Sequence, residues 1–444
     1  MKLFTRKEFI KTFGLASLAF SGLKGVEILL SSRRKHLYNG IPNKKMGVVS
    51  IPDKFSYLVI SNEGDAMSDG LVVPGMFDGM ATFKFDNSRI VIVRNHELYN
   101  RSKYLPCFGK KQELLKNLSK NIIYDSGTSV PEYGGTTNLL YNQLTSRVEK
   151  EFMSLSGTVR NCAGGVTPWG SWISCEESVV RRGNGNLKNH GYNFEVLAAD
   201  KPFSSNSVPL KAMGRFNHEA VGFDLYGNAY QTEDREDGIF YKFIPKVRGD
   251  LSKGKLQGLA LIDRNIKDSR NWKDQSIEVG RKYRTHWINI FDVDSIGDDL
   301  RYQGADKGCL VFARGEGIWS DGSKIYFSAT TGGPEYLGQI WVLETKKNKE
   351  SLTLVFQSSD RSIMKMPDNL TVSPWGDIVF CEDGPGTNYV KGLTPNGEIY
   401  DIVRNEHNSS EFCGVCFSPD GETMFVNIQR PGMTLAIKGP WPLI

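Results

Sequence analysis

The sequence contains Thr167-Pro-Trp-Gly-Ser-Trp-Ile-Ser-Cys-Glu-Glu177 and, in its second half, Ser373-Pro-Trp-Gly-Asp-Ile-Val-Phe-Cys-Glu-Asp383. Each stretch has a Pro-Trp-Gly turn, a run of mostly apolar residues, and a cysteine followed by two acidic residues. Proline and glycine reverse the chain, whereas β-branched and aromatic residues favour strands. The pair therefore predicts a repeated β-hairpin that ends in carboxylates.

Four looser copies of this pattern complete a set of six. They occupy residues 86–97, 225–234, 320–331 and 418–429. The copies are spaced roughly 45 to 95 residues apart, and a regular repeat of short strands is typical of radial architectures. We therefore expect an all-β fold, a six-bladed β-propeller with loop and short-helix insertions around the channel mouth. The insertions are expected at 100–130, 178–212 and 245–308, with a short helix at 111–121.

A strand enters each turn, and a small polar or ligand-type residue lies near its start. These residues are Asp78, Cys162, Glu219, Glu316, Asp368 and Cys413, with Cys162 offset by one or two positions. In a propeller, equivalent residues of the innermost strands converge on one end of the channel. The strand ends add Glu97, Glu176, Glu177, Glu233, Asp234, Glu382 and Asp383. Because so many carboxylates would repel one another, the pattern predicts a metal site.

The residue types indicate more than one kind of metal. Carboxylate oxygens suit calcium, and the thiol of Cys162 favours a softer transition metal, unless it is only a small buried residue. Arg314 lies two residues before Glu316, which suits a bidentate grip on phosphate, although a plain ion pair is the alternative. Arg94, Arg160 and Arg215 hold matching places. His96 and His218 both occur in Asn-His-Glu, and we expect each to orient a neighbouring acid.

Composition excludes several classes of protein. The 444-residue chain has 39% hydrophobic and 24% charged residues, and its net charge of +5 is scattered rather than gathered into a nucleic-acid-binding site. The seven cysteines lack the spacing of a disulfide scaffold. No Walker A, G-x-S-x-G or H-E-x-x-H motif is present.

The N-terminus predicts export. Residues 1–36 combine a basic start with a short apolar run at 12–20, which is too short to span a membrane. Residues 5–11 resemble a twin-arginine signal in which Lys7 replaces the second arginine. We expect residues 45–444 to form a single domain and the mature protein to be periplasmic or secreted. Export machinery is then a partner, and a monomer without a transmembrane segment is expected.

An ordered series of motifs makes the sequence resemble the PhoX-type alkaline phosphatases from about Asp69 to Trp441. The series includes Phe77-Asp-Gly-Met-Ala81, Arg94-Asn-His-Glu97, Cys175-Glu-Glu177, Phe216-Asn-His-Glu-Ala220, Arg314-Gly-Glu-Gly317 and Cys381-Glu-Asp-Gly384. Cys413 departs from the small or hydroxyl residue expected in this family.

The resemblance implies hydrolysis of phosphate monoesters at a cluster of ferric iron (Fe3+) and calcium (Ca2+). The iron ligands that it implies are Cys162, Glu177, Glu219 and Glu316. The calcium ligands that it implies are Glu97, Glu176, Glu233, Asp234, Asp368 and Asp383. It also implies that Arg314 holds the phosphate of a small-molecule substrate.

Two other functions are compatible with the same fold, since a fold alone does not fix function. A calcium-dependent lactonase or a phosphodiesterase could use the channel acids, but a lactonase would need neither Arg314 nor a cysteine ligand. A non-catalytic propeller would be expected to lose several channel acids, which this sequence retains.

Overall fold

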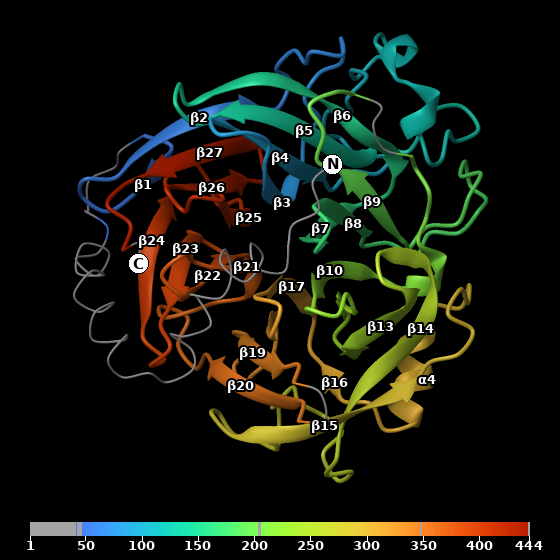
Figure 1. Cartoon of the computed structure of the whole chain (residues 1–444), viewed down its shortest axis with the longest axis vertical. Helices are drawn as coiled ribbons and strands as arrows, with labels where there is room; N and C mark the ends of the chain where they lie inside the picture. Colours follow the sequence, from blue (N-terminus) through green and yellow to red (C-terminus); the bar gives the residue numbers. More distant parts are fainter. Residues whose placement is uncertain (1–40, 42–46, 203–205, 347–348, 443–444) are drawn as a thin grey trace.

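The computed structural model describes residues 41, 47–202, 206–346 and 349–442. Its regular structure is almost entirely β-strand, and the sheets are arranged around a centre like the blades of a propeller (Figure 1). The expectation of an all-β, propeller-like fold is confirmed at this level. The predicted export signal at 1–36 lies outside the described residues. Within the described residues, no helix has the length and apolar character needed to cross a membrane.

Five larger sheets and one small sheet contain the strands. One sheet contains β3 (Phe77–Lys84), β4 (Arg89–His96), β5 (Gly134–Asn142) and β6 (Arg147–Thr158). The next contains β7 (Asn161–Val166), β8 (Ser171–Glu176) and β9 (Asn193–Leu197). The longest contains, in spatial order, β10 (His218–Phe223), β11 (Ala229–Glu233), β13 (Tyr241–Val247), β14 (Asp250–Leu261), β15 (Lys282–Asn289), β20 (Ser351–Gln357), β19 (Gln339–Glu344), β18 (Lys324–Ala329) and β17 (Gly315–Ser320).

The remaining sheets combine the two ends of the described chain. One contains β1 (Val49–Ser50), β24 (Ile399–Asn405), β23 (Tyr389–Leu393), β22 (Ile378–Glu382) and β21 (Pro367–Val372). Another contains β2 (Ser56–Asn62), β27 (Met433–Lys438), β26 (Thr423–Ile428) and β25 (Phe412–Phe417). The small sheet pairs β12 (Gly238–Ile239) with β16 (Val311–Phe312). The helices are η1 (Leu115–Asn117), η2 (Lys120–Ile122), η3 (Lys211–Met213) and α4 (Leu300–Asp306).

The two Pro-Trp-Gly turns join β7 to β8 and β21 to β22. The backbone N–H of Ser373 donates to the carbonyl of Asp377 at 2.8 Å, and Thr167 donates to Ser171 at 2.9 Å. The side-chain oxygens of Ser373 and Thr167 accept from the same partner N–H groups, each at 2.9 Å. Gly376 has a φ of 92°, a left-handed conformation that glycine adopts without steric cost. The Pro-Trp-Gly repeat therefore encodes one turn, used twice.

The innermost strands pack side by side in a closed circle. β3 packs against β7, and the series continues through β10, β17, β21 and β25 back to β3. The N-terminal strand β2 pairs antiparallel with β27, and these blue and red strands run together in Figure 1. Hydrogen bonds between the first and last parts of the described chain thus close the circle.

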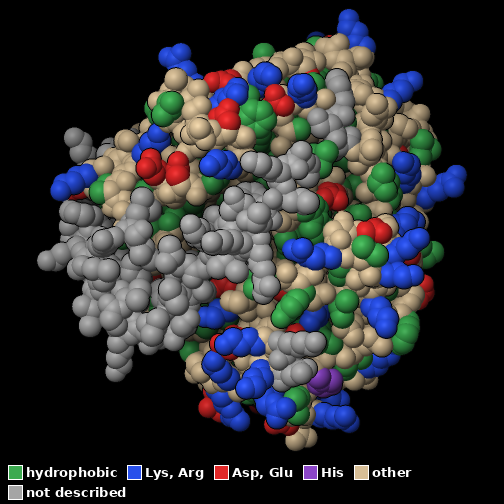
Figure 2. All heavy atoms as spheres, viewed as in Figure 1, with side chains coloured by type: hydrophobic (Ala, Val, Ile, Leu, Met, Phe, Trp, Pro, Cys, Tyr) green, Lys and Arg blue, Asp and Glu red, His purple; other side chains and the backbone are tan. Residues whose placement is uncertain are grey.

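The hydrophobic core lies between neighbouring sheets. Tyr326 and Ile340 of one sheet, for example, pack with Ile378 and Phe380 of the next. Such strands are covered on both faces, which explains why β22 is buried throughout. On the face seen in Figure 2, basic side chains stand out near β15 and β20, with acidic side chains among them.

The insertions differ from their prediction in one place. Residues 245–308 were expected to be rich in loops, but they contain the long strand β14, which pairs along its length with β13 and then with β15. β15 also pairs with β20, so this insertion joins two neighbouring sheets at their outer edges. The short helix expected at 111–121 is present as the 3-10 turns η1 and η2.

Glycines let the innermost strands approach one another. A Cβ atom on Gly165 of β7 would lie 1.6 Å from the carbonyl oxygen of Val221 in β10. On Gly317 of β17, it would lie 2.7 Å from the Cα of Asn369 in β21. Neither gap accepts a methyl group, so these strands approach closely only because glycine has no side chain.

We expect Gly165→Ala to lower the free energy of unfolding by about 1–3 kcal/mol, because the added methyl overpacks the contact between β7 and β10. Gly297→Ala is the matched control, since Gly297 is exposed and the nearest atoms to an added Cβ, at 3.3 Å, belong to side chains. Urea denaturation of both variants measures the difference. Equal transition midpoints would contradict the packing role of Gly165.

Candidate metal centre

One irregularity recurs in the innermost strand of every hairpin. The register to the second strand shifts, so that two residues of the innermost strand oppose one residue of its partner. Such a β-bulge bends the strand and re-aims its side chains. The first residues of the bulges are equivalent, and we call them the ring residues: Asp78, Cys162, Glu219, Glu316, Asp368 and Gly414.

The register corrects two details of the sequence analysis. Cys162 is not offset from the acids, because Asn161 pairs with Glu176 and Cys162 is the first bulge residue. Cys413 is not a ring residue, because it pairs directly with Asn427 and the bulge begins at Gly414. The thiol of Cys413 instead donates to the backbone carbonyl of Phe77 at 2.9 Å. Strand register, which the sequence pattern does not fix to one residue, decides both positions.

Two sets of buried or half-buried donor atoms meet at the ring. One sulfur or carboxylate oxygen from each of Cys162, Glu177 and Glu219 lies within 4.8 Å of the others. The same limit joins oxygens of Glu219, Glu316 and Asp368. Glu219 belongs to both sets, so the two groups adjoin. Four of the residues are ring residues, and Glu177 directly follows β8.

Burial and crowding raise the pKa values of these groups. Burial, together with the negative charges of Glu316 and Glu177, raises the pKa of Glu219 well above its usual value. Burial and the charge of Asp383 raise the pKa of Asp368 to about 8. Burial and the charge of Glu219 likewise raise the pKa of the Cys162 thiol. The site therefore disfavours its own negative charges, and a bound cation would reverse that preference.

Two arginines form equivalent ion pairs with acids around the ring. Arg160 donates to Glu97 at 2.7 Å and to Glu177 at 2.5 Å. Arg314 donates to Asp234 at 2.8 Å and to Glu316 at 2.5 Å. Each arginine thus bridges acids from two neighbouring hairpins.

The backbone sets the direction of both arginines. Arg160 and Arg314 lie two positions before a ring residue and have φ values of 49° and 53°. Met76 and Met366 occupy the corresponding places before Asp78 and Asp368, with φ values of 52° and 46°. A left-handed conformation at a non-glycine residue is uncommon and costs free energy, so its recurrence at one repeat position indicates a constraint of the ring.

One donor group of each arginine remains available. Both guanidinium groups use Nε and Nη2 for the acids, and among the described residues neither Nη1 has a hydrogen-bond partner. The side chain of Arg160 is 41% exposed and that of Arg314 is 26% exposed. An anion at the mouth can therefore reach donor groups that the acids already hold in place.

Two predicted ligands are turned away from the ring. The carboxylate of Glu176 accepts from His190 at 2.6 Å and from the backbone N–H of Gly191 at 2.8 Å. That of Glu233 accepts from the hydroxyl of Tyr241 at 2.8 Å and pairs with Arg301 at 3.3 Å. Successive side chains of a strand point to opposite faces, so the second acid of each Glu-Glu or Glu-Asp pair faces the mouth while the first is buried in the sheet.

The two histidines contact backbone and hydroxyl groups rather than the carboxylates that we expected. His96 lies 3.0 Å from the carbonyl of Gly75 and 3.0 Å from the hydroxyl of Thr137. His218 lies 3.0 Å from the carbonyl of Gly214. Burial lowers the pKa of both imidazoles, so both are neutral.

Two further arginines also face away from the mouth. Arg94 is fully buried and pairs with Glu151 at 2.6 Å. Arg215 donates to the backbone carbonyls of Val179 at 2.6 Å and Ser295 at 3.3 Å. The four arginines therefore differ in role. Arg94 and Arg215 are buried and stabilise the fold, whereas Arg160 and Arg314 pair with the acids at the mouth.

Two polar residues that the sequence pattern did not single out, Glu411 and Gln429, contact the acids around the ring. Glu411 shares a hydrogen bond with Asp383, and burial together with that contact raises the pKa of Glu411 well above its usual value. Gln429 donates to Glu97 at 3.0 Å. Gln429 directly follows β26, as Glu97, Glu177, Asp234 and Asp383 follow the second strands of their hairpins. Gln429 could therefore have been predicted from its position in the repeat. Glu411 could not, because the other repeats have no acid at the equivalent position.

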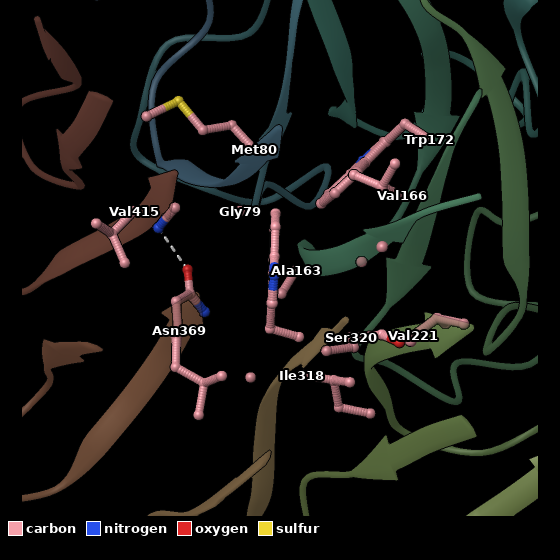
Figure 3. A pocket seen from close by; sticks show the side chains of 18 of the residues that line it. Gly79, Met80, Ala163, Val166, Trp172, Val221, Ile318, Ser320, Asn369 and Val415 are labelled. Atoms are coloured by element: carbon pink, nitrogen blue, oxygen red, sulfur yellow. Dashed lines mark hydrogen bonds between the residues drawn. The ribbon is translucent and has the colours of Figure 1, made fainter. Parts of the chain in front are cut away.

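Small and apolar residues line the channel next to the ring. Figure 3 shows this pocket, into which Gly79, Ala163, Val221, Ile318, Asn369 and Val415 project from different innermost strands. The side-chain oxygen of Asn369 accepts from the backbone N–H of Gly414 at 2.5 Å, drawn as a dashed line in Figure 3. The ring residues therefore adjoin a mostly apolar pocket, because residues that directly follow them in sequence line it.

His190 yields a pH-dependent prediction. Burial alone would lower the pKa of His190, but Glu176 and Asp125 outweigh burial and raise it from 6.5 to about 10. The folded protein keeps a proton that the unfolded chain releases, so this stabilisation is complete below pH 6.5 and is lost as the pH rises through about 10. We expect wild type to exceed His190→Asn in free energy of unfolding by an amount that shrinks over this range, measured by denaturant titration at each pH. A constant difference would contradict the buried imidazolium.

Comparison with known proteins adds to this geometry. A family model described as alkaline phosphatase PhoX matches residues 36–432. No curated protein matches the chain. Among solved structures, PhoX of Pseudomonas fluorescens in complex with vanadate, a transition state analogue, is 18% identical, with a TM-score of 0.67 over 92% of this chain and 98% of that one. A gluconolactonase from Xanthomonas campestris is 11% identical, with a TM-score of 0.44 over 89% of this chain and 98% of that one. The first likeness shows a shared fold.

Proposed function

Because the chain belongs to the alkaline phosphatase PhoX family, we propose that it hydrolyses phosphate monoesters at a cluster of iron and calcium ions in its channel mouth. The protein is an alkaline phosphatase and hence a hydrolase. The observation that carries the metal-centre proposal is the pair of adjoining donor sets that share Glu219, flanked by two arginines with available donors. The six innermost strands support a six-bladed propeller as the scaffold of this site.

The residues present fit such a cluster. A thiol beside two carboxylates, with a third in the adjoining set, suits iron, and we assign that role to Cys162, Glu177, Glu219 and Glu316. Oxygen donors suit calcium, and we assign that role to the acids at the mouth: Glu97, Asp234, Asp368 and Asp383. Glu176 and Glu233 are left out because their carboxylates are turned away from the ring, toward His190 and Tyr241. When bound, the ions supply Lewis-acid stabilisation of charge on a phosphoryl group.

The chain's own residues would bind and orient the substrate. Arg314 is held by Asp234 and Glu316, so its guanidinium needs little reorganisation to donate to a phosphate oxygen. Arg160, which precedes β7, presents an equivalent guanidinium group, and one hairpin separates it from that of Arg314. Together the two arginines would fix the phosphate between them, with its ester oxygen directed outward.

A calcium-dependent lactonase or a phosphodiesterase is the alternative on this scaffold. A lactonase requires neither a thiol among the metal ligands nor arginines at the mouth. The position of Cys162 within a donor set and of Arg314 against Glu316 favours phosphate chemistry.

We also propose that residues 1–36 direct export, by the twin-arginine route, to the periplasm or beyond, and that residues 45–444 act as a single domain. This proposal rests on the basic and apolar pattern of the N-terminus.

We expect the purified chain, refolded with iron and calcium, to bind both metals and to release phosphate from p-nitrophenyl phosphate. Glu316→Gln removes a carboxylate from one donor set and should lower activity by roughly 100-fold or more, with less bound metal by elemental analysis. Glu335→Gln, at an exposed position, is the control and should match wild type. A metal-loaded wild type without phosphatase activity would contradict the phosphatase proposal, and a chain that binds neither metal would contradict the metal centre.

Arg314 provides a separate test of phosphate binding. We expect Arg314→Lys to raise KM for p-nitrophenyl phosphate and the inhibition constant for inorganic phosphate by roughly tenfold, because lysine lacks the planar fork. The metal content should stay unchanged, since Arg314 is not assigned as a ligand. Unchanged KM and inhibition constants would show that Arg314 serves only its ion pairs with Asp234 and Glu316.

A further inference from the structure

A second, larger hollow opens beside the metal centre. Its volume is about 1150 Å³, and it is lined by two surface segments, residues 99–104 and 178–186. Glu97 and Arg160 also line it, and both belong to the mouth already described. A substrate whose phosphate contacts Arg160 would therefore extend its remaining atoms into this hollow.

The walls of the hollow carry excess positive charge. Arg101, Lys103, Arg181 and Arg182 are all exposed, and none of them forms an ion pair with another described residue. The hollow also contains two acids, which are already engaged. Glu97 accepts from Arg160 and Gln429. Glu132 is buried, burial raises its pKa, and it accepts from the backbone N–H of Asn100 at 2.8 Å.

Backbone hydrogen bonds hold both segments in place. Gly183 and Asn186 exchange N–H···O bonds of 3.0 Å, which makes a tight hairpin beside Arg181 and Arg182. The N–H of Arg182 donates to Asn189 at 2.8 Å. On the other wall, the N–H of Ser102 donates to the carbonyl of Tyr99 at 2.8 Å. The basic side chains therefore project from ordered backbone, so that binding an anion does not require a loop to fold first.

We propose that this hollow binds a second anionic group on the substrate, so that the preferred substrates are small molecules that carry two phosphates. The proposal rests on the proposed phosphatase function and adds a substrate class to it. Guanidinium groups match phosphate oxygens in pairs, and three of the four basic residues are arginines. One phosphate would lie between Arg160 and Arg314, and the second would lie among the basic residues of the hollow.

The test compares two sugars that differ by one phosphate, fructose 6-phosphate and fructose 1,6-bisphosphate, with the metal-loaded full chain. We expect wild type to prefer the bisphosphate by about tenfold in kcat/KM. The double variant Arg181→Gln/Arg182→Gln should lose most of this preference through a higher KM for the bisphosphate, with unchanged kinetics for fructose 6-phosphate. Lys253→Gln/Lys255→Gln removes two exposed positive charges from β14, away from the hollow, and should behave as wild type.

The outcomes separate this inference from the function on which it rests. Equal kcat/KM for the two sugars, or a preference that survives Arg181→Gln/Arg182→Gln, overturns the anion site and leaves the phosphatase intact. An equal loss of preference in Lys253→Gln/Lys255→Gln also overturns it, because overall charge would then be the cause. Hydrolysis of neither sugar by a metal-loaded wild type that still hydrolyses p-nitrophenyl phosphate overturns the inference, and failure on all three compounds contradicts the phosphatase proposal itself.

Discussion

The mutual repulsion of buried negative groups at one end of the channel is the constraint around which this molecule is built. Glu219 lies within reach of acids on both sides, and burial removes the water that would screen their charges. Arg160 and Arg314 offset part of this repulsion by bridging acids of neighbouring hairpins. The surrounding structure has to hold these acids together, because their interactions with one another are repulsive. The closed circle of strands, tied by β2 and β27, provides that restraint.

The bulges connect the site to the fold. Each bulge turns a ring residue toward the mouth, and a glycine or alanine follows directly in four of the six: Gly79, Ala163, Ala220 and Gly317. At Gly79, an added Cβ would lie 2.6 Å from the Cα of Ala163 on the next innermost strand. Small residues at these places therefore set the distance between strands, and that distance sets how close the ring residues come. The close approach of the innermost strands is therefore needed both for packing and for bringing the ring residues together.

Much of this could be predicted from the sequence, because turn chemistry and strand propensity are local. The Pro-Trp-Gly turns and the strands after them lie where the pattern indicates, and Cys162, Glu177, Glu219, Glu316 and Asp368 do meet. What failed depends on strand register. A shift of one residue exchanges the two faces of a strand, which explains the misplacement of Cys413. The same alternation turns Glu176 and Glu233 toward His190 and Tyr241. The basic hollow lies on insertions without a repeat partner. Glu411 directly precedes β25, at a position where the other repeats carry no acid, so the repeat gave no signal for either.

Paired acids in this chain show how one local motif supports two tasks. Glu176 and Glu177 are adjacent, yet Glu176 shares His190 with Asp125 in the interior while Glu177 faces Arg160 at the mouth. A carboxylate that is buried and fully hydrogen-bonded is costly to disturb, so Glu176 stabilises the start of the segment that continues through residues 178–186. That segment forms one wall of the basic hollow. The first acid of the pair thus positions the wall that would contact the far end of a substrate, and the second lies where its phosphate would react.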